Sequence, residues 1–194
     1  MSSFAHLHVH TEYSMLDGAA RVKPLIEAAV EQGMPAIGIS DHGNNFGAFD
    51  FYKTAKAAGI KPVIGIEAYL SPGTPRQDRS RVRWGSGGED DISGGGAFTH
   101  MTMFAENTDG MYNLFRMSSK AWLDGFYFKP RMDRELLQTY GKGIIATTGC
   151  ASGEIQTRLR LGQYAEAKKA AGEFQEIFGK ENFYAEIMDH GLDI

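Results

Sequence analysis

The stretch KPVIGIEAYL, at residues 61–70, decides the fold of this chain. It is an apolar run that follows Gly59, a residue suited to end the helix predicted over residues 46–58. Apolar runs that alternate with helical patterns predict parallel strands joined by crossover helices. One carboxylate, Glu67, interrupts the run, and burying it would cost several kcal/mol unless it is paired or bound to a cation. The stretch therefore predicts a core strand that carries a cation site.

The same alternation extends outward from this strand in both directions. Further strands are predicted over residues 4–10, 36–40, 99–105, 144–147 and 183–188. Further helices are predicted over residues 24–32, 111–121 and 164–178. This order predicts one α/β domain that begins as a βαβαβ unit.

Composition excludes several classes of protein. The chain has 194 residues, of which 42% are hydrophobic and 23% charged, as is ordinary for one soluble α/β domain. A net charge of -4 argues against a surface that coats nucleic acid generally. The N-terminus lacks a basic region followed by an apolar run, and no run is long enough to span a membrane, which predicts a cytoplasmic protein without membrane contact. The single cysteine, Cys150, is left as a buried thiol, a nucleophile or a metal thiolate.

Side chains of metal-binding type fall near the ends of the predicted strands. His8 and His10 are two residues apart, so a strand would turn both to one face and let them bind one ion together. The C-terminal ends of parallel strands gather functional groups at one edge. His100 fits this rule less well, because it precedes its apolar run instead of following it. The candidate metal ligands are His8, His10, Asp17, His42, Glu67, His100 and Cys150.

Each candidate also has a plainer interpretation. A lone histidine such as His42 is more often a helix cap, a surface group or a satisfied core imidazole than a ligand. Asp17 before Gly18 is by itself a turn, and Cys150 by itself is a small buried hydrophobe. One ion cluster, however, removes the cost of burying Glu67 and explains the other residues together. His190 follows a strand but has no partner, and it is interpreted as structural or as a substrate contact.

Residues 71–97 are polar and rich in glycine, which predicts a long loop outside the core. Basic and aromatic side chains in this loop are suited to bind phosphates and stack a base. These candidate DNA contacts are Arg76, Arg79, Arg81, Arg83 and Trp84. A solvated loop whose charge is offset by nearby acidic residues is the favoured alternative, because long loops often carry no chemistry.

Four segments resemble a known family. They are HLHVHTEYSMLDG (6–18), SDHGNNFGAFDFY (40–52), GIKPVIGIEAYL (59–70) and TTGCASGEIQTRL (147–159). Together they closely resemble the PHP (polymerase and histidinol phosphatase) domain of bacterial replicative DNA polymerase III alpha subunits, most of all the actinobacterial type. The resemblance covers essentially the whole chain. It implies a distorted (β/α)7 barrel with a trinuclear metal cluster and, in metal-retaining members, a 3'-5' exonuclease that proofreads the growing strand.

The ligands of the family, carried over by motif, match the seven candidates above, including His100. The last strand in the family contributes an Asp-x-His pair, and no such pair occurs before Ile194. The resemblance therefore implies that residues 1–194 are an incomplete PHP domain, with a barrel truncated at its C-terminal end and without the polymerase domains. His6 occupies a position that is Asp in many PHP proteins, and it is assigned no ligand role.

The expected chemistry follows from charge. The oxygens of a phosphodiester are already negative, and divalent cations neutralise that charge and lower the pKa of a bound water. Imidazoles and a thiolate favour zinc, whereas Asp17 and Glu67 also tolerate manganese or magnesium. We expect up to three ions, with Glu67 placed to bridge two of them and the seven ligands acting through the metals. Removal of nucleotides from a DNA 3' end is the expected reaction.

Three functions remain open at this point. The first is a proofreading exonuclease domain, whose partners by resemblance are the primer 3' end, the remaining polymerase domains and replisome subunits such as the sliding clamp. The second is a non-catalytic domain that stabilises the polymerase and docks a separate exonuclease subunit. The third is a small-molecule phosphoesterase of the histidinol phosphatase type. The extended match over residues 13–18 and 147–159 disfavours the third.

Overall fold

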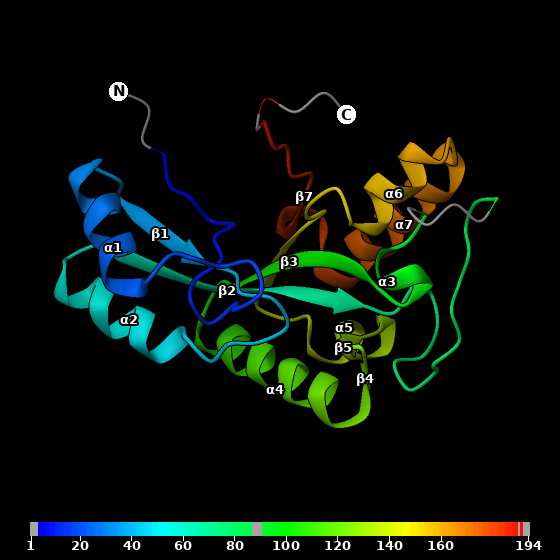
Figure 1. Ribbon diagram of the computed structural model, residues 1–194, viewed down its shortest axis with the longest axis horizontal. Coiled ribbons are helices and arrows are strands. Elements are labelled where there is room, and N and C mark those ends of the chain that lie inside the picture. The colour runs from blue at the N-terminus through cyan, green and yellow to red at the C-terminus, as the bar shows by residue number, and fades with distance from the viewer. Residues whose placement is uncertain (1–3, 87–90, 190, 192–194) are drawn as a thin grey trace.

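The computed structural model describes residues 4–86, 91–189 and 191, and its centre is the long strand β2 (Lys61–Leu70). The first half of β2 pairs in parallel with β1 (Ala36–Ile39). The second half lies between β3 (Thr99–Ala105), which is antiparallel to it, and β5 (Lys129–Met132), which is parallel to it. Figure 1 shows β2 and β3 running side by side through the middle of the molecule.

The remaining strands extend this sheet at its two edges. On one edge β4 (Phe126–Tyr127) pairs antiparallel with β5. On the other, β6 (Ile144–Thr147) pairs antiparallel with β3, and β7 (Phe183–Tyr184) pairs in parallel with β6. Among the described residues the order is therefore β4-β5-β2-β3-β6-β7, with β1 on β2.

The predicted α/β class is confirmed, but the prediction that all strands run parallel is wrong. Strand β3 runs against β2 and β6, because residues 71–98 join β2 to β3 without a long crossover helix. A parallel neighbour needs such a crossover, whereas an antiparallel return does not. The start of β3 therefore lies beside the end of β2.

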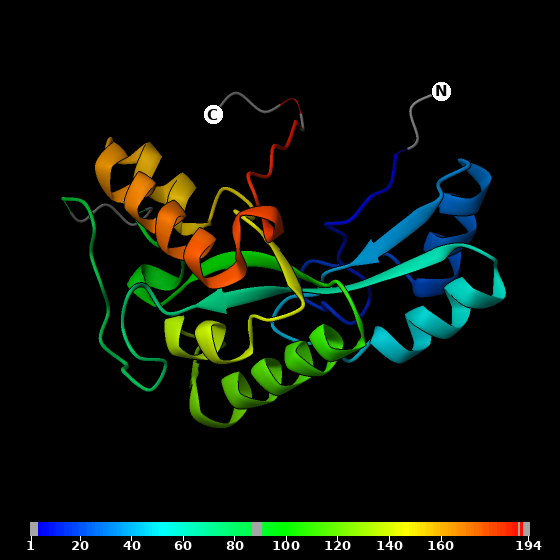
Figure 2. The same ribbon diagram turned by 180° about the vertical axis from the view of Figure 1, so that it is seen from behind.

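Helices cover both faces of the sheet. They are α1 (Val22–Glu31), α2 (Ala48–Ala57), α3 (Ser93–Gly96), α4 (Thr108–Asp124), α5 (Arg134–Tyr140), α6 (Glu154–Arg160) and α7 (Tyr164–Phe178), with a 3-10 turn at Lys180–Asn182. Figures 1 and 2 show α4 on one side of β2 and β3, and α6 with α7 on the other. Helix α1 and helix α2 lie near the far end of β2, beside β1. No helix of the described residues is long and apolar enough to cross a membrane.

Strand β2 takes part in two hydrophobic cores. The first packs α1, α2 and β1 against the start of β2 and includes Ile64. The second packs α4, α5 and α7 against β3, β6 and the end of β2, and includes Ile66. Glu67 follows directly after this junction, so both cores fix its position.

Several predicted boundaries match the structure. The predictions for β2, β3, β6 and α7 have the observed bounds, while β7 is shorter than predicted. Helix α4 begins earlier than predicted, because the side chain of Asn107 accepts a hydrogen bond from Gly110 N at 2.9 Å and caps its N-terminus. The short elements β4, β5, α5 and α6 were not predicted.

The predicted strand over residues 4–10 is wrong, because this described segment forms an irregular extended chain. Gly38 N donates to His6 O at 2.7 Å, and Ser40 N donates to Val9 O at 2.8 Å. The two hydrogen bonds are therefore three residues apart on this segment, from His6 to Val9, but only two residues apart on the neighbouring chain, from Gly38 to Ser40. A regular ladder needs equal steps on both chains, so the extra residue breaks the pairing.

The described parts of the predicted loop, residues 71–86 and 91–97, contain no element longer than α3 and are anchored to the core. In α3, Gly94 and Gly95 have φ of 63° and 64°, so this short element is a turn. Arg131 is fully buried, and its Nη2 donates to the backbone oxygens of Arg76 and Asp78 at 2.8 and 2.7 Å. The loop is therefore held by a buried guanidinium.

Candidate metal centre

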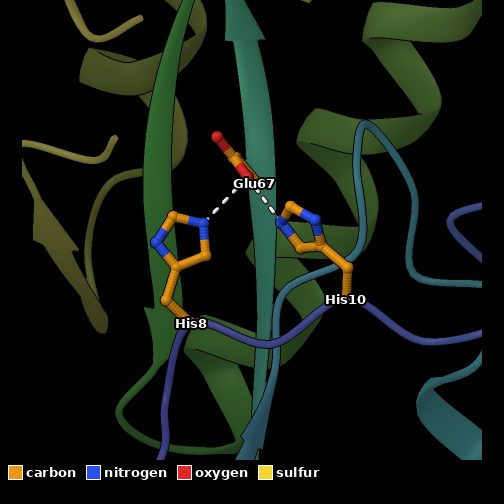
Figure 3. Close-up of side chains that lie close together, drawn as sticks. All are labelled: His8, His10 and Glu67. Atoms are coloured by element: carbon orange, nitrogen blue, oxygen red, sulfur yellow. Dashed lines mark hydrogen bonds and ion pairs between the residues drawn. The ribbon is translucent and has the colours of Figure 1, made fainter. Parts of the chain in front are cut away.

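Glu67 lies at the centre of a group of imidazoles. Its side chain is 1% exposed, and its Oε2 lies 2.8 Å from His8 Nε2 and 2.6 Å from His10 Nε2. The same oxygen is 3.4 Å from His42 Nε2, while Oε1 lies 2.8 Å from His100 Nδ1. Figure 3 shows His8 and His10 reaching Glu67 from one chain segment, on either side of the carboxylate. The prediction that these two histidines face one point therefore holds without a regular strand.

Asp17 extends the group outward. Its Oδ2 lies 2.7 Å from His10 Nδ1 and 2.9 Å from His42 Nε2, and its Oδ1 accepts from Ser14 Oγ at 2.7 Å. A tight turn presents this carboxylate, since Gly18 N donates to Ser14 O at 2.7 Å. The turn therefore aims Asp17 at the two histidines that also approach Glu67.

His100 and Cys150 complete the group from the opposite side. Cys150 Sγ lies 3.2 Å from Glu67 Oε1 and 3.5 Å from His100 Nδ1. His100 is at the start of β3, paired in register with Tyr69 near the end of β2. Because β3 is antiparallel, its beginning lies at the edge where β2 ends. The same edge receives the chain that follows β6, which carries Cys150.

All seven predicted ligands thus lie within one group around Glu67. Three sets have ligand atoms within 4.8 Å of one another: His8, His10 and Glu67; His10, Asp17 and His42; and His42, Glu67 and His100. Cys150 lies beside the third set. Each set can hold one metal ion.

The contacts made by the ring nitrogens of His8 and His10 fit the binding of divalent cations. Both ring nitrogens of His8 face carboxylates, Nε2 towards Glu67 and Nδ1 towards Glu186 at 2.6 Å. Both nitrogens of His10 also face carboxylates, those of Glu67 and Asp17. A neutral imidazole has only one N–H, so the second contact needs either an added proton or a metal ion. A cation bound between these groups would remove that requirement.

In the metal-free site, burial and the close approach of these groups shift their pKa values. Burial lowers the pKa of His8, but hydrogen bonds with Glu186 and Glu67 outweigh it and raise the value to about 9. Burial acts against His10 in the same way, and Glu67 again raises its pKa. Burial alone would raise the pKa of Glu67, yet hydrogen bonds with His10, His100 and His8 lower it far below its usual range. The carboxylate therefore stays ionised in the core.

The pKa values of three other groups of the site are shifted as well. Burial lowers the pKa of His42 to about 4, which leaves its ring neutral and able to act as a ligand. Burial, with the nearby charge of Glu67, raises the pKa of Cys150 to about 12, so its thiol keeps its proton in the absence of a cation. Burial also raises the pKa of Asp17, but Ser14 and the neighbouring histidines outweigh this and lower it. Asp17 is therefore a carboxylate at neutral pH.

Sequence reasoning missed Glu186. This residue follows β7, and its Oε2 accepts a hydrogen bond from Thr147 Oγ1 at 2.5 Å while Oε1 faces His8. Burial raises its pKa, but the bonds with His8 and Thr147 outweigh burial and lower it. The signal was present, because Glu186 is an acidic residue inside a predicted strand, as Glu67 is. Asp41 is buried too, but it accepts from Thr11 N at 2.6 Å and holds the chain rather than facing the group.

Two further histidines lie apart from the group or outside the described residues. His6 is exposed, and its ring meets that of Phe4 edge-on, with the ring centroids 4.8 Å apart. His190 is not among the described residues.

The candidate DNA contacts divide into buried and exposed side chains. Arg76 is 7% exposed and bonds with Asp133, so the structure argues against its prediction as a phosphate contact. Trp84 is half-buried, with the Arg158 guanidinium 3.7 Å from its ring centroid, so one ring face is already covered. The arginines that remain exposed are Arg79, Arg81 and Arg83.

Comparison with known proteins identifies the class. The sequence matches the PHP domain family over residues 6–190, and the chain belongs to that family. It is 58% identical, over 98% of its length, to DNA polymerase III subunit alpha of Saccharopolyspora erythraea. It is 56% identical, over its whole length, to the same subunit of Mycobacterium tuberculosis, and 44% identical over 97% of its length to that of Deinococcus radiodurans.

The chain spans a small part of these relatives, 17%, 16% and 14% of their respective lengths. Among solved structures, an amidohydrolase from Chromobacterium violaceum is similar with a TM-score of 0.48 and 12% identity, over 93% of this chain and 84% of that one.

Proposed function

We propose that this PHP domain is a metal-dependent 3'-5' exonuclease that proofreads DNA as part of a polymerase III alpha subunit. The observation that carries the proposal is the surrounding of one buried carboxylate, Glu67, by four imidazoles and a thiol. A site built only for stability would pair a buried carboxylate once or twice, because each additional buried polar group adds a desolvation cost. The family match and the similarity to DNA polymerase III alpha subunits support DNA as the substrate.

The residues that would hold up to three divalent ions are those of the three sets, two of which contain Glu67, with Cys150 beside the third set. Imidazole and thiolate ligands favour zinc, and the carboxylates of Asp17 and Glu67 also tolerate manganese or magnesium. When bound, such ions neutralise phosphodiester charge and lower the pKa of a water molecule.

The protein itself orients the ligands. A hydrogen bond from His8 Nδ1 to Glu186 leaves the lone pair on Nε2, which is the nitrogen that faces Glu67. Asp17 can do the same for His10 through Nδ1. Thr147 holds Glu186 in turn. With an ion in place of the second proton, this arrangement would set the tautomer of each ring.

The test is removal of the terminal nucleotide from a labelled, mismatched primer by the full-length protein, with metal content measured on the same sample. Asp17→Asn removes a ligand charge while keeping the shape of the side chain. Asp50→Asn is the matched control, because Asp50 is exposed on α2. We expect metal-dependent excision that Asp17→Asn abolishes, with less bound metal, and that Asp50→Asn retains.

Other outcomes would favour the alternative functions. Bound metal without excision would contradict hydrolysis and make the domain a scaffold that docks a separate exonuclease. Hydrolysis of small phosphomonoesters without DNA excision would instead indicate a phosphoesterase of the histidinol phosphatase type. As part of a replicative polymerase in the cytoplasm, the domain would work beside the polymerase domains and the sliding clamp.

A further inference from the structure

A cleft lined by aromatic side chains opens directly beside the metal centre. It has a volume of about 520 Å³, and its lining includes Asp17 and His42 of the centre. The rest of the wall is largely apolar. We call it the aromatic cleft; the large rings that line it are those of Tyr13, Phe46, Tyr69, Trp122, Phe126 and Phe128.

Trp122 is fixed next to the metal centre by the backbone. Its Nε1 donates to Gly43 O at 2.9 Å, and Gly43 directly follows His42. A side chain at Gly43, whose φ is 66°, would place its Cβ 2.8 Å from Pro130 Cγ. The close packing of this loop therefore couples the position of the indole to that of a candidate ligand.

Several rings of the cleft face solvent and lie near one another. The ring centroids of Trp122 and Phe126 are 5.5 Å apart at 25°, and those of Trp122 and Phe46 are 6.2 Å apart at 33°. Phe46 is 67% exposed, Phe126 48% and Trp122 42%. Apolar rings gathered at the surface in this way mark a binding site more often than chance exposure does.

Two further residues of the cleft are Phe128 and Lys129. Phe128 has φ of 61°, a left-handed conformation that a bulky residue adopts only under constraint, and its ring is 55% exposed in the cleft. Lys129 lines the same cleft, with its Nζ 5.4 Å from the centroid of the Tyr69 ring. The cleft thus joins exposed rings and a positive charge to the metal centre.

We infer that the aromatic cleft binds the unpaired nucleobases at the 3' end of a DNA strand. Every base has a π face that stacks on an aromatic side chain, which gives binding without dependence on sequence. Lys129 would balance the charge of a phosphate between stacked bases. A base-paired end keeps its bases in the duplex, so the cleft would favour frayed or mismatched ends. This inference rests on the proposed function and names the substrate form that the site selects.

The first test is a photo-cross-link that needs no activity. An oligonucleotide with 5-iododeoxyuridine at its 3' terminus is irradiated with the full-length protein in the presence of chelator, and the cross-linked peptides are mapped. We expect cross-links at Phe46, Trp122 or Phe126. Cross-links confined to peptides outside the cleft would overturn the inference, even if the domain is an exonuclease.

The second test separates stacking from chemistry. Phe46→Leu and Phe126→Leu should each raise the KM for a single-stranded 3' end about tenfold, with a smaller change in kcat. Their effect on a fully paired end should be smaller. Phe49→Leu is the matched control on α2, and Tyr112→Leu the control on α4, because Phe49 is 76% and Tyr112 51% exposed and neither lines the cleft. Equal KM values for cleft and control variants would contradict the inference. If the unaltered protein itself shows no excision, that result contradicts the proposed function instead.

Discussion

Two buried ion clusters in this domain differ in how they balance charge. The metal-centre cluster places four imidazoles around the carboxylate of Glu67. The arginine cluster places three carboxylates around the guanidinium of Arg76, which lies 3.1 Å from Asp133, 3.1 Å from Glu135 and 3.2 Å from Asp124. Both clusters join segments far apart in the sequence.

The arginine cluster brings its own permanent cation, since a guanidinium is always charged and presents several donors to carboxylates. Two of its three carboxylates, Asp124 and Glu135, are open to water. The metal-centre cluster instead calls for an added proton or cation, because His8 and His10 each direct both ring nitrogens at carboxylates. A buried carboxylate whose partners call for an added proton or cation therefore points to a binding site, whereas one paired with a permanent guanidinium points to a structural support.

The largest expected effect comes from Glu67→Gln. The amide keeps the shape but loses the charge that two of the three candidate ligand sets share, so we expect metal binding and excision to fall by more than about 100-fold. Metal content and primer excision measure this. Glu106→Gln, at an exposed position after β3, is the control. Native metal content in the Glu67 variant would refute the assignment of this residue as a ligand.

The arginine cluster should respond in stability alone. Arg76→Met leaves buried Asp133 without its cation, so we expect a loss of about 3 kcal/mol in the free energy of unfolding, with unchanged metal content. Asp124 and Glu135 are more exposed and remain solvated, so their loss of a partner adds little to the loss in the free energy of unfolding. Denaturant unfolding measures it. Arg79→Met, at an exposed position of the same loop, should change stability by less than about 0.5 kcal/mol.

Chelation should separate the two clusters in one experiment. A ligand present at about 100 times its Kd stabilises the native state by roughly 2.7 kcal/mol, so removal of metal should lower the Tm of the unaltered protein. Arg76→Met should lose the same further amount, because its metal centre is intact. Glu67→Gln should show no shift. An equal shift in all three proteins would mean that the chelator acts elsewhere.

The smallest effect is expected from Glu186→Gln. Glu186 contacts His8 and, among the described residues, belongs to none of the sets that could hold an ion; loss of such a partner typically costs 10- to 100-fold in metal affinity. Metal titration of the protein measures this shift. Glu181→Gln, at a neighbouring exposed position, serves as control. A loss as complete as that of Glu67→Gln would make Glu186 a ligand itself.

The sequence was most informative where one local pattern decided the outcome. Strand β2 and helix α7 have their predicted bounds, because an apolar run between turn signals and an amphipathic repeat are both local. The seven candidate ligands also come together, which strand-end placement and family motifs predicted in combination. Their role as metal ligands stays a prediction.

The features that the sequence did not predict depend on contacts between segments that are far apart in the chain. Nothing within residues 99–105 states that β3 runs antiparallel, and only that direction brings His100 to the end of β2. The irregular chain at residues 4–10 depends on an extra residue opposite β1, which appears only once both partners are placed. Arg76 was expected in solvent, and its burial depends on three carboxylates that lie about 50 to 60 residues away in the chain.

The position of Glu67 on a strand shared by two cores sets a limit on changes in chain length. Ile64 packs in one core and Ile66 in the other, so an inserted or deleted residue between them would reverse the side chains of one half of β2 relative to the other. Glu67 would then turn from its imidazoles, however well each core packed. The length of β2 between Ile64 and Ile66 therefore sets the direction of the Glu67 side chain.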